Sequence, residues 1–504
     1  MKSSIYGIIN IGASAFRMIV VENNKKTTKE IDYLIKPLRL GLDTFSQGYI
    51  SLEHVKQATQ ILQGFKRKLE EYNIKEYKAV CTSGLREASN KDFFIDYIRI
   101  HVGIDLTILD PSEEIYIKYL GVKTLVPNFN KMEAEGVVFA NIASGNITLA
   151  VTKGDNIIFS GALPYGSLRL RQMFLQIESN KRYRAFDQYA ENMVRTVANH
   201  IDSSIKVKNL VGGGSSINMM LRIFKPEKDY ILGKDLNDLY NKIRTYTKQE
   251  IIDDLYLRDD EAEVLVPTIC TYIHLLKFTG ADRFYFSKID FPATLTKFYT
   301  HQLKDSAFYK RVKNTILYVA EKYNVNINHA KKVAKYAQKL FIELEDIHSL
   351  DKDIFSILEI ASFLYQVGDY VDTTNSLYNS YHIINSISIP GLNTRSLYLS
   401  SCVVYNMSET SLEKEVTYMN SLTIEETLII NKLTCFLQIA SSLDASKKNL
   451  IEDFQIEQRE NLVLIKAKVY KEPFVELFTF DKYKKNFEET FGIRIDIRTN
   501  INYD

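Results

Sequence analysis

Three short loops of small residues in this 504-residue chain have the composition of phosphate-binding turns. They are NIGASAF at 10–16, NIASGNI at 141–147 and VGGGSS at 211–216. Glycine lets the backbone approach a ligand closely, and backbone N–H groups at the start of a helix attract phosphate. A single triglycine is more often only a tight strand-to-helix turn, but three such loops together favour a phosphate-binding cleft.

Two of these loops begin with an amide side chain where a carboxylate is expected, at Asn10 and Asn141. Residues 10–20 align without gaps with residues 141–151, and each stretch has the pattern of a strand, a small-residue turn and a second strand. A repeat about 130 residues apart indicates a duplicated domain, because solenoid periods are much shorter. Two such hairpins facing each other would place turn amides from both domains around one ligand.

The elements that position these loops follow from the periodicity of the apolar residues. Residues 51–72 have helical spacing behind a Ser51 cap, and strand-like runs flank a helix near 91–102, so the first block is rich in βαβ units. A second block with three strand-like runs begins near 135, and the chain is helical almost throughout from about 306 to 450. We predict four domains, at residues 1–130, 131–303, 304–450 and 451–504.

Composition narrows the class of protein. Hydrophobic residues make up 45% and charged residues 25%, which is typical of globular protein. The 64 Lys and Arg against 62 Asp and Glu give a net charge of +2, so we expect neither a nucleic-acid nor a membrane partner, and no long apolar run predicts a membrane span. Four cysteines without a CxxC pair argue against structural zinc and disulfides and favour a reducing cytoplasm. They are Cys81, Cys270, Cys402 and Cys435.

The order of motifs along the whole chain resembles the exopolyphosphatase and guanosine pentaphosphate phosphatase (Ppx/GppA) family. INIGASAFRM resembles the family's first phosphate loop, NIASGNITL its second and GGGSS its third. Four further stretches resemble other family motifs: PLRLGL at 37–42, TSGLREASN at 82–90, SEEIYIKYLGV at 112–122 and LPYGSLRL at 163–170. Seven matches in the right order indicate the family.

This resemblance implies an α/β fold of two actin-like lobes, of the ribonuclease H-like type found in sugar kinases and Hsp70. An all-α HD-like domain and a small α+β C-terminal domain would follow. The resemblance also implies Mg²⁺-dependent hydrolysis of a terminal phosphoanhydride of polyphosphate or guanosine pentaphosphate, and a homodimer. Such chemistry requires turn amides and an arginine to neutralise phosphoryl charge, a divalent cation, and a carboxylate that orients or deprotonates water.

The general base implied by the resemblance is Glu114. From the residues alone, Asp110 and the following Pro-Ser-Glu predict a helix N-terminus, and Glu114 in its first turn would equally complement the helix dipole and pair with Lys118. An arginine at a loop-to-helix junction is often solvated or paired locally, but its fork suits a phosphate edge. The phosphate-binding residues implied by the resemblance are Gly12, Ser14, Arg17, Arg86, Gly145, Gly212, Gly213, Gly214, Ser215 and Ser216.

Three departures from the family pattern affect the metal. Family members have Asp at the positions of Asn10 and Asn141 and Glu at that of Thr148, where these residues hold the metal and water. Mg²⁺ prefers carboxylates and phosphate, so we expect these residues to bind it weakly, with help from the substrate's own oxygens. Fewer negative charges, conversely, would help the site hold a polyanion.

The helical region resembles the HD-type phosphohydrolase domain that longer family members append. An active HD site binds metals through histidines, a His-Asp pair and a distal Asp. His329 and Asp444 match this pattern. The other positions are occupied by Tyr365, Gln366, Asn379 and Asn406. Two ligands do not hold a dinuclear centre, so we predict a vestigial site without metal, in which His329 packs between helices.

Two functions follow from these patterns. The first is a Ppx/GppA-type phosphatase with weakened metal-dependent activity, and the alternative is an inactive family member that binds polyphosphate or an alarmone nucleotide as a sensor or regulator. An actin-like ATPase or sugar kinase would need an acidic residue in the first or second loop and matches no better. Five basic residues could form a polyanion groove, but such clusters are more often solvated helix surfaces, and we favour that interpretation. They are Arg169, Arg171, Lys181, Arg182 and Arg184.

Overall fold

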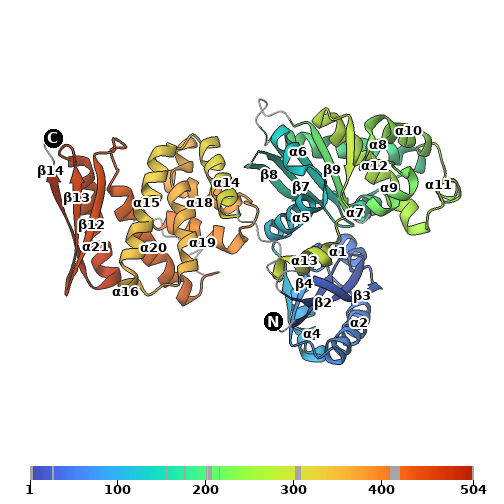
Figure 1. Ribbon diagram of the computed structural model, residues 1–504, viewed down its shortest axis with the longest axis horizontal. Helices are drawn as coiled ribbons and strands as arrows, with labels where there is room; N and C mark the ends of the chain where they lie inside the picture. Colours follow the sequence, from blue (N-terminus) through green and yellow to red (C-terminus); the bar gives the residue numbers. More distant parts are fainter. Residues whose placement is uncertain are drawn as a thin grey trace. The chain divides into compact units, whose positions relative to one another are not determined.

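The computed structural model describes residues 4–24, 28–154, 156–174, 177–199, 201, 207–214, 216–300, 308–408 and 421–501. The chain forms two compact units, Met1–Arg311 and Val312–Asp504, and each is described by itself (Figure 1). The first unit contains both predicted lobes. The second contains most of the predicted helical domain and the predicted C-terminal domain.

The first lobe is built on a five-stranded sheet in the order β3-β2-β1-β4-β5. Its elements are β1 (Ser4–Ile11), β2 (Ala15–Asn23), β3 (Thr28–Pro37), α1 (Leu40–Gln47), α2 (Leu52–Glu71), β4 (Glu76–Cys81), α3 (Ser83–Arg86), α4 (Lys91–Val102) and β5 (Leu106–Ile108). Strand β1 runs antiparallel to β2 and parallel to β4. Because side chains alternate along a strand, Ile9 packs in the core formed with α2 and α4, while Ile8 belongs to a separate core on the other face.

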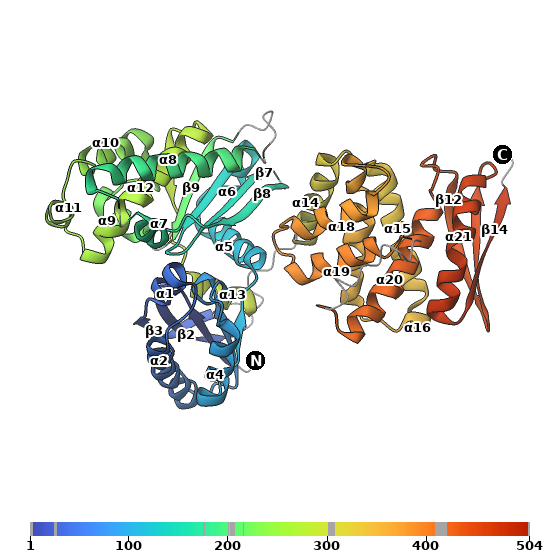
Figure 2. The same ribbon diagram turned by 180° about the vertical axis from the view of Figure 1, so that it is seen from behind.

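The second lobe repeats this arrangement around a six-stranded sheet in the order β10-β11-β9-β6-β7-β8. Its elements are β6 (Val137–Ile142), β7 (Ile147–Lys153), β8 (Asn156–Leu163), α7 (Ser167–Met173), α8 (Ser179–Ala198), β9 (Asn209–Gly214), α9 (Ile217–Phe224), β10 (Tyr230–Leu232), α10 (Gly233–Ile243), α11 (Lys248–Leu255), α12 (Asp259–Thr279) and β11 (Arg283–Phe286). Strand β6 runs antiparallel to β7 and parallel to β9, as β1 does to β2 and β4. Helices α8 and α12 pack side by side (Figure 2).

Two helices connect the lobes. The remaining elements of the unit are α5 (Pro111–Leu125), α6 (Phe129–Glu135) and α13 (Phe291–Tyr299). On α5, Ile117 packs in a core with the first sheet, while Ile115 packs in a core with the second. On α13, Leu295 packs in the first sheet's core. Helix α5 therefore lies between the two sheets and α13 returns to the first lobe, so packing crosses the predicted boundaries at 130 and 303.

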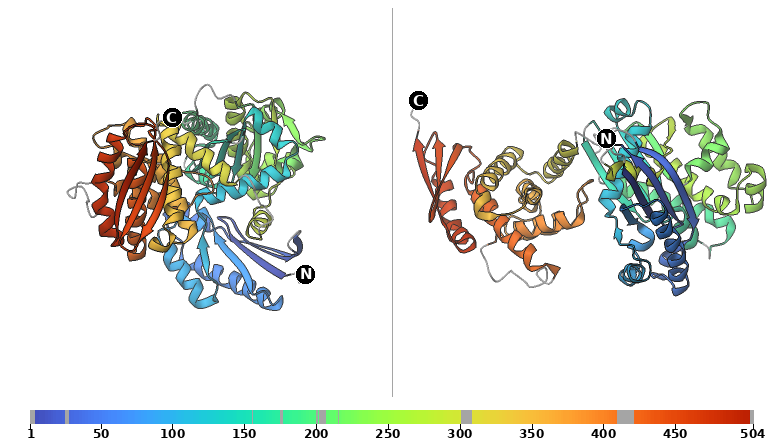
Figure 3. Two further views of the ribbon diagram at one scale, coloured as in Figure 1. Left: turned by 60° about the vertical axis from the view of Figure 1, so that its left-hand side comes forward. Right: turned by 60° about the horizontal axis from the view of Figure 1, so that its bottom comes forward.

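The second unit contains a helical part and a small sheet. The helices are α14 (Phe308–Lys322), which begins just before the division, α15 (Ile327–Glu343), α16 (Glu345–His348), α17 (Phe355–Leu364), α18 (Ser376–Ser386), α19 (Thr394–Tyr405) and α20 (Ile424–Ser442), with 3₁₀ turns η1 (Lys352–Ile354) and η2 (Val367–Tyr370). The sheet contains β12 (Ile451–Arg459), β13 (Leu462–Val469) and β14 (Arg494–Ile501), and α21 (Phe474–Phe491) connects its last two strands. Because β13 and β14 are parallel, their connection crosses over, and α21 lies along one face of the sheet (Figure 3).

Two further observations concern the predicted absence of a membrane span and the predicted free cysteines. Within the described ranges, no helix is both long and apolar enough to cross a membrane. All four cysteines have free thiols and are buried. Burial raises the pKa of the Cys81 thiol, so this group is a poor nucleophile.

Candidate functional site in the cleft between the lobes

A cavity of about 390 Å³ lies between the two lobes, where all three small-residue loops meet. Its walls come from the β1–β2 turn, the β6–β7 turn, the end of β9 and the start of α9, α5 and the segment before α13. The predicted site residues that line it are Asn10, Gly12, Ser14, Arg17, Glu114, Asn141, Gly145 and Gly214. Their roles stay predictions, but the structure places these side chains and turns around one space.

The first two loops have the same turn geometry. The Gly12 N–H donates to the Ala15 carbonyl at 3.1 Å, and at the aligned positions the Ala143 N–H donates to the Asn146 carbonyl at 3.0 Å. Each hydrogen bond closes a tight turn between two antiparallel strands. The alignment read from the sequence therefore corresponds to two equivalent turns.

Strand register fixes the residues beside these turns. Asn10 on β1 lies opposite Arg17 on β2, and Asn141 on β6 lies opposite Thr148 on β7. On its other side, Asn141 is paired with Gly213 on β9. The three positions where the family resemblance implies a carboxylate therefore lie at the ends of strands next to the cavity, although Thr148 itself is fully buried.

Two glycines of the cavity wall are closely packed, and at Gly214 the neighbouring backbone leaves no room for a side chain. A Cβ on Gly214, whose φ is +108°, would lie 2.0 Å from the Ile142 carbonyl oxygen. A Cβ on Gly145 would lie 2.1 Å from the ring of Phe45 in the first lobe. The second loop thus contacts helix α1 of the opposite lobe directly, which brings the two lobes together at the cavity.

Four of the predicted phosphate-binding residues in the third loop are not among the residues that line the cavity. Three of them are described by the structure and one is not. Gly212 and Gly213 are buried within β9. The Ser216 hydroxyl is buried 3.3 Å from the Thr268 hydroxyl. Ser215 lies outside the described residues.

Glu114 is buried, with 4% of its surface exposed, and both of its oxygens are occupied. Oε1 accepts a hydrogen bond from Lys118 Nζ at 2.5 Å, and Oε2 accepts one from Arg86 Nη1 at 2.9 Å. Burial raises the pKa of this carboxyl, but the charges and hydrogen bonds of Lys118 and Arg86 outweigh burial and lower its pKa to about 2. A carboxylate of such low basicity is a poor acceptor for a proton from water.

Arg86 is held beside the cavity by two hydrogen bonds. Its Nη1 donates to Glu114 and also to the Leu109 carbonyl at 2.9 Å. Arg86 does not line the cavity, so its predicted contact with phosphate would require a rearrangement of this pair. Arg17, in contrast, lines the cavity from β2.

Lys118 contributes a cation to the cavity wall. It is 4% exposed, and besides Glu114 its Nζ contacts the Thr148 hydroxyl at 3.3 Å. The ammonium also lies 5.1 Å from the centre of the Phe291 ring, a favourable cation–π distance. The pairing between Lys118 and Glu114 that helical spacing predicts is therefore present, and both residues line the cavity.

The residues at the predicted metal position do not suit a resident divalent cation. Asn10, Asn141 and Thr148 offer only neutral oxygens, and Asn10 Oδ1 is buried without a partner. Glu114 already binds two cationic side chains. At an effective dielectric constant of 20, two unit positive charges 4 Å apart repel by about 4 kcal/mol, and a divalent ion doubles this. Lys118 would therefore repel a divalent cation placed beside Glu114 and Thr148.

Sequence reasoning missed a second carboxylate at the cavity. Asp290 lines it just before α13, and its Oδ1 accepts a hydrogen bond from the Tyr33 hydroxyl at 3.2 Å. Burial raises the pKa of Asp290 above its ordinary value, although the Tyr33 hydrogen bond opposes this. The segment IDFPATLTKF matches no family motif, so no signal marked Asp290. The position of Lys118 had a signal, a lone lysine in the apolar helical run IYIKYLGV.

Several residues of the predicted basic groove are paired. Arg169 bonds to Glu87 of the first lobe, donates from Nε to the Gly145 carbonyl at 2.8 Å, and stacks 4.2 Å from the Phe45 ring centre. Arg171 pairs with Glu263. Arg169 therefore connects the second loop to the first lobe, and neither the groove nor the favoured interpretation as a solvated helix surface is tested by these contacts.

The predicted vestigial site in the second unit forms a closed cluster. His329 Nδ1 lies 2.7 Å from Asp444 Oδ2, and Nε2 lies 2.5 Å from the Tyr365 hydroxyl. Lys332 Nζ lies 3.7 Å from Asp444 Oδ1. The Gln366 Oε1 atom is buried without a hydrogen-bond partner. Both ring nitrogens of His329 thus have protein partners, as expected for a packing histidine.

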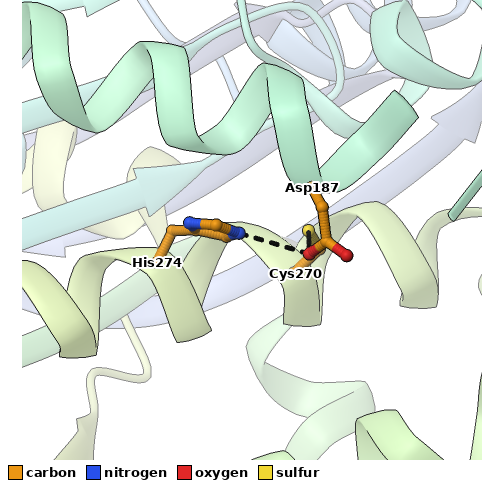
Figure 4. Close-up of side chains that lie close together, drawn as sticks. All are labelled: Asp187, Cys270 and His274. Atoms are coloured by element: carbon orange, nitrogen blue, oxygen red, sulfur yellow. Dashed lines mark hydrogen bonds and ion pairs between the residues drawn. The ribbon is translucent and has the colours of Figure 1, made fainter. Parts of the chain in front are cut away.

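A third cluster of possible ligands lies outside the cavity, between α8 and α12 (Figure 4). Asp187 Oδ1 accepts hydrogen bonds from the Cys270 thiol and from His274 Nε2, both at 3.2 Å, and Oδ2 accepts one from the Tyr240 hydroxyl at 3.0 Å. Burial raises the pKa of Asp187, but these hydrogen bonds outweigh it and lower the pKa. Three donors contact this carboxylate, which connects α8 to α10 and α12.

Two lobes of repeated topology that close on a cavity lined by three small-residue loops define a class of phosphate-handling proteins with the actin-like fold. Residues 19–286 match the model of the Ppx/GppA phosphatase family, and residues 312–476 match the model described as Ppx/GppA phosphatase, domain III. The first match covers more than half of the chain. The chain belongs to the Ppx/GppA phosphatase family.

Solved structures support the fold. The exopolyphosphatase from Cytophaga hutchinsonii is 19% identical, with a TM-score of 0.53, and the alignment covers 60% of this chain and 99% of that one. The Ppx/GppA family member from Aquifex aeolicus is 18% identical, with a TM-score of 0.50, over 60% of this chain and all of that one. The predicted two actin-like lobes followed by a helical region are confirmed. The HD likeness of that region stays a prediction.

This chain matches only part of a longer curated relative. The bifunctional 3-dehydroquinate synthase/phosphatase from Fusobacterium nucleatum is 24% identical over 264 residues. The match spans 48% of this chain but only 39% of the relative. Because the match covers less than half of that protein, the two activities in its name are properties of the relative.

Proposed function

We propose that this chain binds the terminal phosphates of inorganic polyphosphate or guanosine pentaphosphate in the cavity between its lobes, and acts as a sensor or regulator. The convergence of the three small-residue loops on one cavity carries this proposal. Among the described residues that line it, the cations Arg17, Lys118 and Lys288 outnumber the carboxylates Glu114 and Asp290. This balance suits an anionic ligand better than a cation.

The state of Glu114 favours binding over fast hydrolysis. The residue that the family resemblance assigns as general base has a pKa of about 2 and gives both oxygens to protein cations. The three positions implied to hold Mg²⁺ are neutral. Phosphate-binding loops are thus retained beside a catalytic group that is poorly suited to activate water.

Titration calorimetry with inorganic tripolyphosphate and with guanosine pentaphosphate tests the proposal. We expect saturable binding of at least one of them to the full chain. Arg17→Ala, which removes a cavity cation, should weaken binding at least tenfold. Arg195→Ala is the matched control, since Arg195 is on α8 and pairs with Glu191 at the surface. Absence of saturable binding, or equal loss in both variants, would contradict the proposal.

A second candidate is slow hydrolysis with Asp290 as the base. It is favoured by the position of Asp290 on the cavity wall and by the raised pKa of its carboxyl, which makes it a stronger base than Glu114. Phosphate release from either compound distinguishes the candidates. If hydrolysis occurs, Asp290→Asn should reduce it by about 100-fold, within the usual range for a general base. Equal phosphate release by wild type, Asp290→Asn and Glu114→Gln would contradict hydrolysis in the cavity and leave the sensor function as the remaining proposal.

A further inference from the structure

The buried ammonium of Lys118 occupies the part of the cleft that the family pattern assigns to metal and catalysis. It contacts Glu114 at 2.5 Å and the hydroxyl of Thr148 at 3.3 Å, so it bridges helix α5 and strand β7. Lys118 also belongs to the cavity wall. A positive charge is therefore built into the chain where a cation would otherwise be needed.

The charges of Glu114, Arg86 and Lys118 do not cancel, and one positive charge is left over. Arg86 by itself neutralises Glu114, so Lys118 gives the group of three a net charge of +1. In the family pattern, three acidic side chains bind a divalent ion. Here the three acids are absent, and a lysine is present beside one of their positions, Thr148.

Three polar atoms at the cavity are open to a polar occupant. Asn10 Oδ1, Asn146 Oδ1 and Ser287 Oγ are buried without a hydrogen-bond partner, and all three residues line the cavity. Buried polar groups are nearly always satisfied in proteins, so these atoms require water or a ligand.

We infer that Lys118 replaces the divalent cation in this cleft, so that the chain binds phosphoanhydrides without a metal. The inference rests on the function proposed above and adds the residue that makes binding metal-independent. The Lys118 ammonium and Arg17 together supply the positive charge for the terminal phosphate, while Arg86 holds Glu114 in its ionised form.

Binding of inorganic tripolyphosphate to the full wild-type chain, measured by calorimetry in EDTA and again in excess Mg²⁺, tests this inference without any variant. We expect affinities within about threefold of each other in the two conditions. Binding that appears only with Mg²⁺ overturns the inference and leaves the proposed function standing. Absence of binding in both conditions overturns the proposed function itself.

Lys118→Met should lose at least tenfold in affinity in EDTA, because the excess charge is removed. Lys123→Met is the matched control: Lys123 is on the same helix but pairs with Glu133 and does not line the cavity. Unchanged affinity of a folded Lys118→Met chain, checked by circular dichroism, overturns the inference, as does an equal loss in Lys123→Met.

Introducing acidic residues at positions 10, 141 and 148 tests the inference from the opposite direction, by measuring metal binding. The variant Asn10→Asp/Asn141→Asp/Thr148→Glu with Lys118→Met should bind Mn²⁺, seen as loss of the free-ion signal in electron paramagnetic resonance. The same three substitutions with Lys118 retained should bind at least tenfold more weakly. Equal Mn²⁺ binding by these two variants would show that Lys118 does not occupy the cation position and would overturn the inference.

Discussion

The carboxylates of Glu114 in the cleft and Asp444 in the second unit both lie at positions to which the family resemblance assigns a role. That role is a general base for Glu114 and a metal ligand for Asp444, and each carboxylate contacts protein cations or a histidine. Glu114 binds Arg86 and Lys118, and Asp444 contacts His329 and Lys332. In both regions a lysine lies within reach of the surviving acid. The two regions differ in what surrounds the pair.

The cleft pair faces a cavity, whereas the other pair is enclosed by side chains. Glu114 and Lys118 line a space of about 390 Å³. His329 is 3% exposed and has both ring nitrogens bonded, to Asp444 and to Tyr365. The structure therefore leaves room for a ligand beside Glu114, whereas Asp444 and His329 are part of the packing.

The largest expected effect comes from breaking the cleft pair. Glu114→Gln leaves Arg86 and Lys118 buried without their counter-charge, and we expect a loss of about 3–4 kcal/mol in the free energy of unfolding. Guanidinium-induced unfolding of the full chain measures it. The double variant Glu114→Gln/Lys118→Met should recover at least about 1 kcal/mol, because one unpaired charge is removed. A loss below about 1 kcal/mol for the single variant would show that the pair is not buried as described.

A smaller effect is expected from the enclosed pair. Asp444→Asn weakens charged hydrogen bonds to His329 and should destabilise the chain by about 2 kcal/mol. Its affinity for tripolyphosphate should stay within twofold of wild type, because the cluster belongs to the packing. Thermal unfolding and calorimetry provide the two numbers. A tenfold change in affinity without unfolding would assign a binding role to this cluster and remove the contrast with the cleft.

The pH dependence of stability sharpens the comparison further. The pKa of Glu114 is about 2 in the folded chain against 4.5 ordinarily, so its ionised form stabilises the fold above pH 4.5. This contribution is lost progressively as the pH falls from about 5 towards 2. Between these limits, wild type should lose about 2 kcal/mol more than Glu114→Gln/Lys118→Met in urea unfolding. Parallel pH curves for the two proteins would contradict the lowered pKa.

The smallest effect is expected at the helix surface. Lys181 on α8 pairs with Glu178, and both side chains are exposed. Lys181→Ala should change the free energy of unfolding by less than about 0.5 kcal/mol, as is usual for exposed pairs. If the solvated-surface interpretation is right, tripolyphosphate affinity should change by less than twofold in calorimetry. A loss of tenfold would instead support a polyanion groove that extends beyond the cleft.

Much of the architecture was accessible from local patterns. The gapless alignment of residues 10–20 with 141–151 predicted two equivalent hairpins, and their Gly12 and Ala143 hydrogen bonds are equivalent in the structure. Strand alternation and small-residue turns depend on neighbours in sequence, so such features are legible in one chain. The convergence of the three loops followed from the duplication and the family resemblance, and the cavity confirms that they share one space.

What the amino-acid sequence by itself determined is the pair of hairpins, the glycine-rich bend and the neutral side chains of Asn10, Asn141 and Thr148. Tertiary structure alone decided that α5 lies between the two sheets, which turns Lys118 towards Thr148, 30 residues away, and towards Phe291. It also brought Asp290 to the cavity and enclosed His329 between Asp444 and Tyr365. These contacts join residues that are distant in the chain, and their geometry depends on how whole layers pack, which no local pattern encodes.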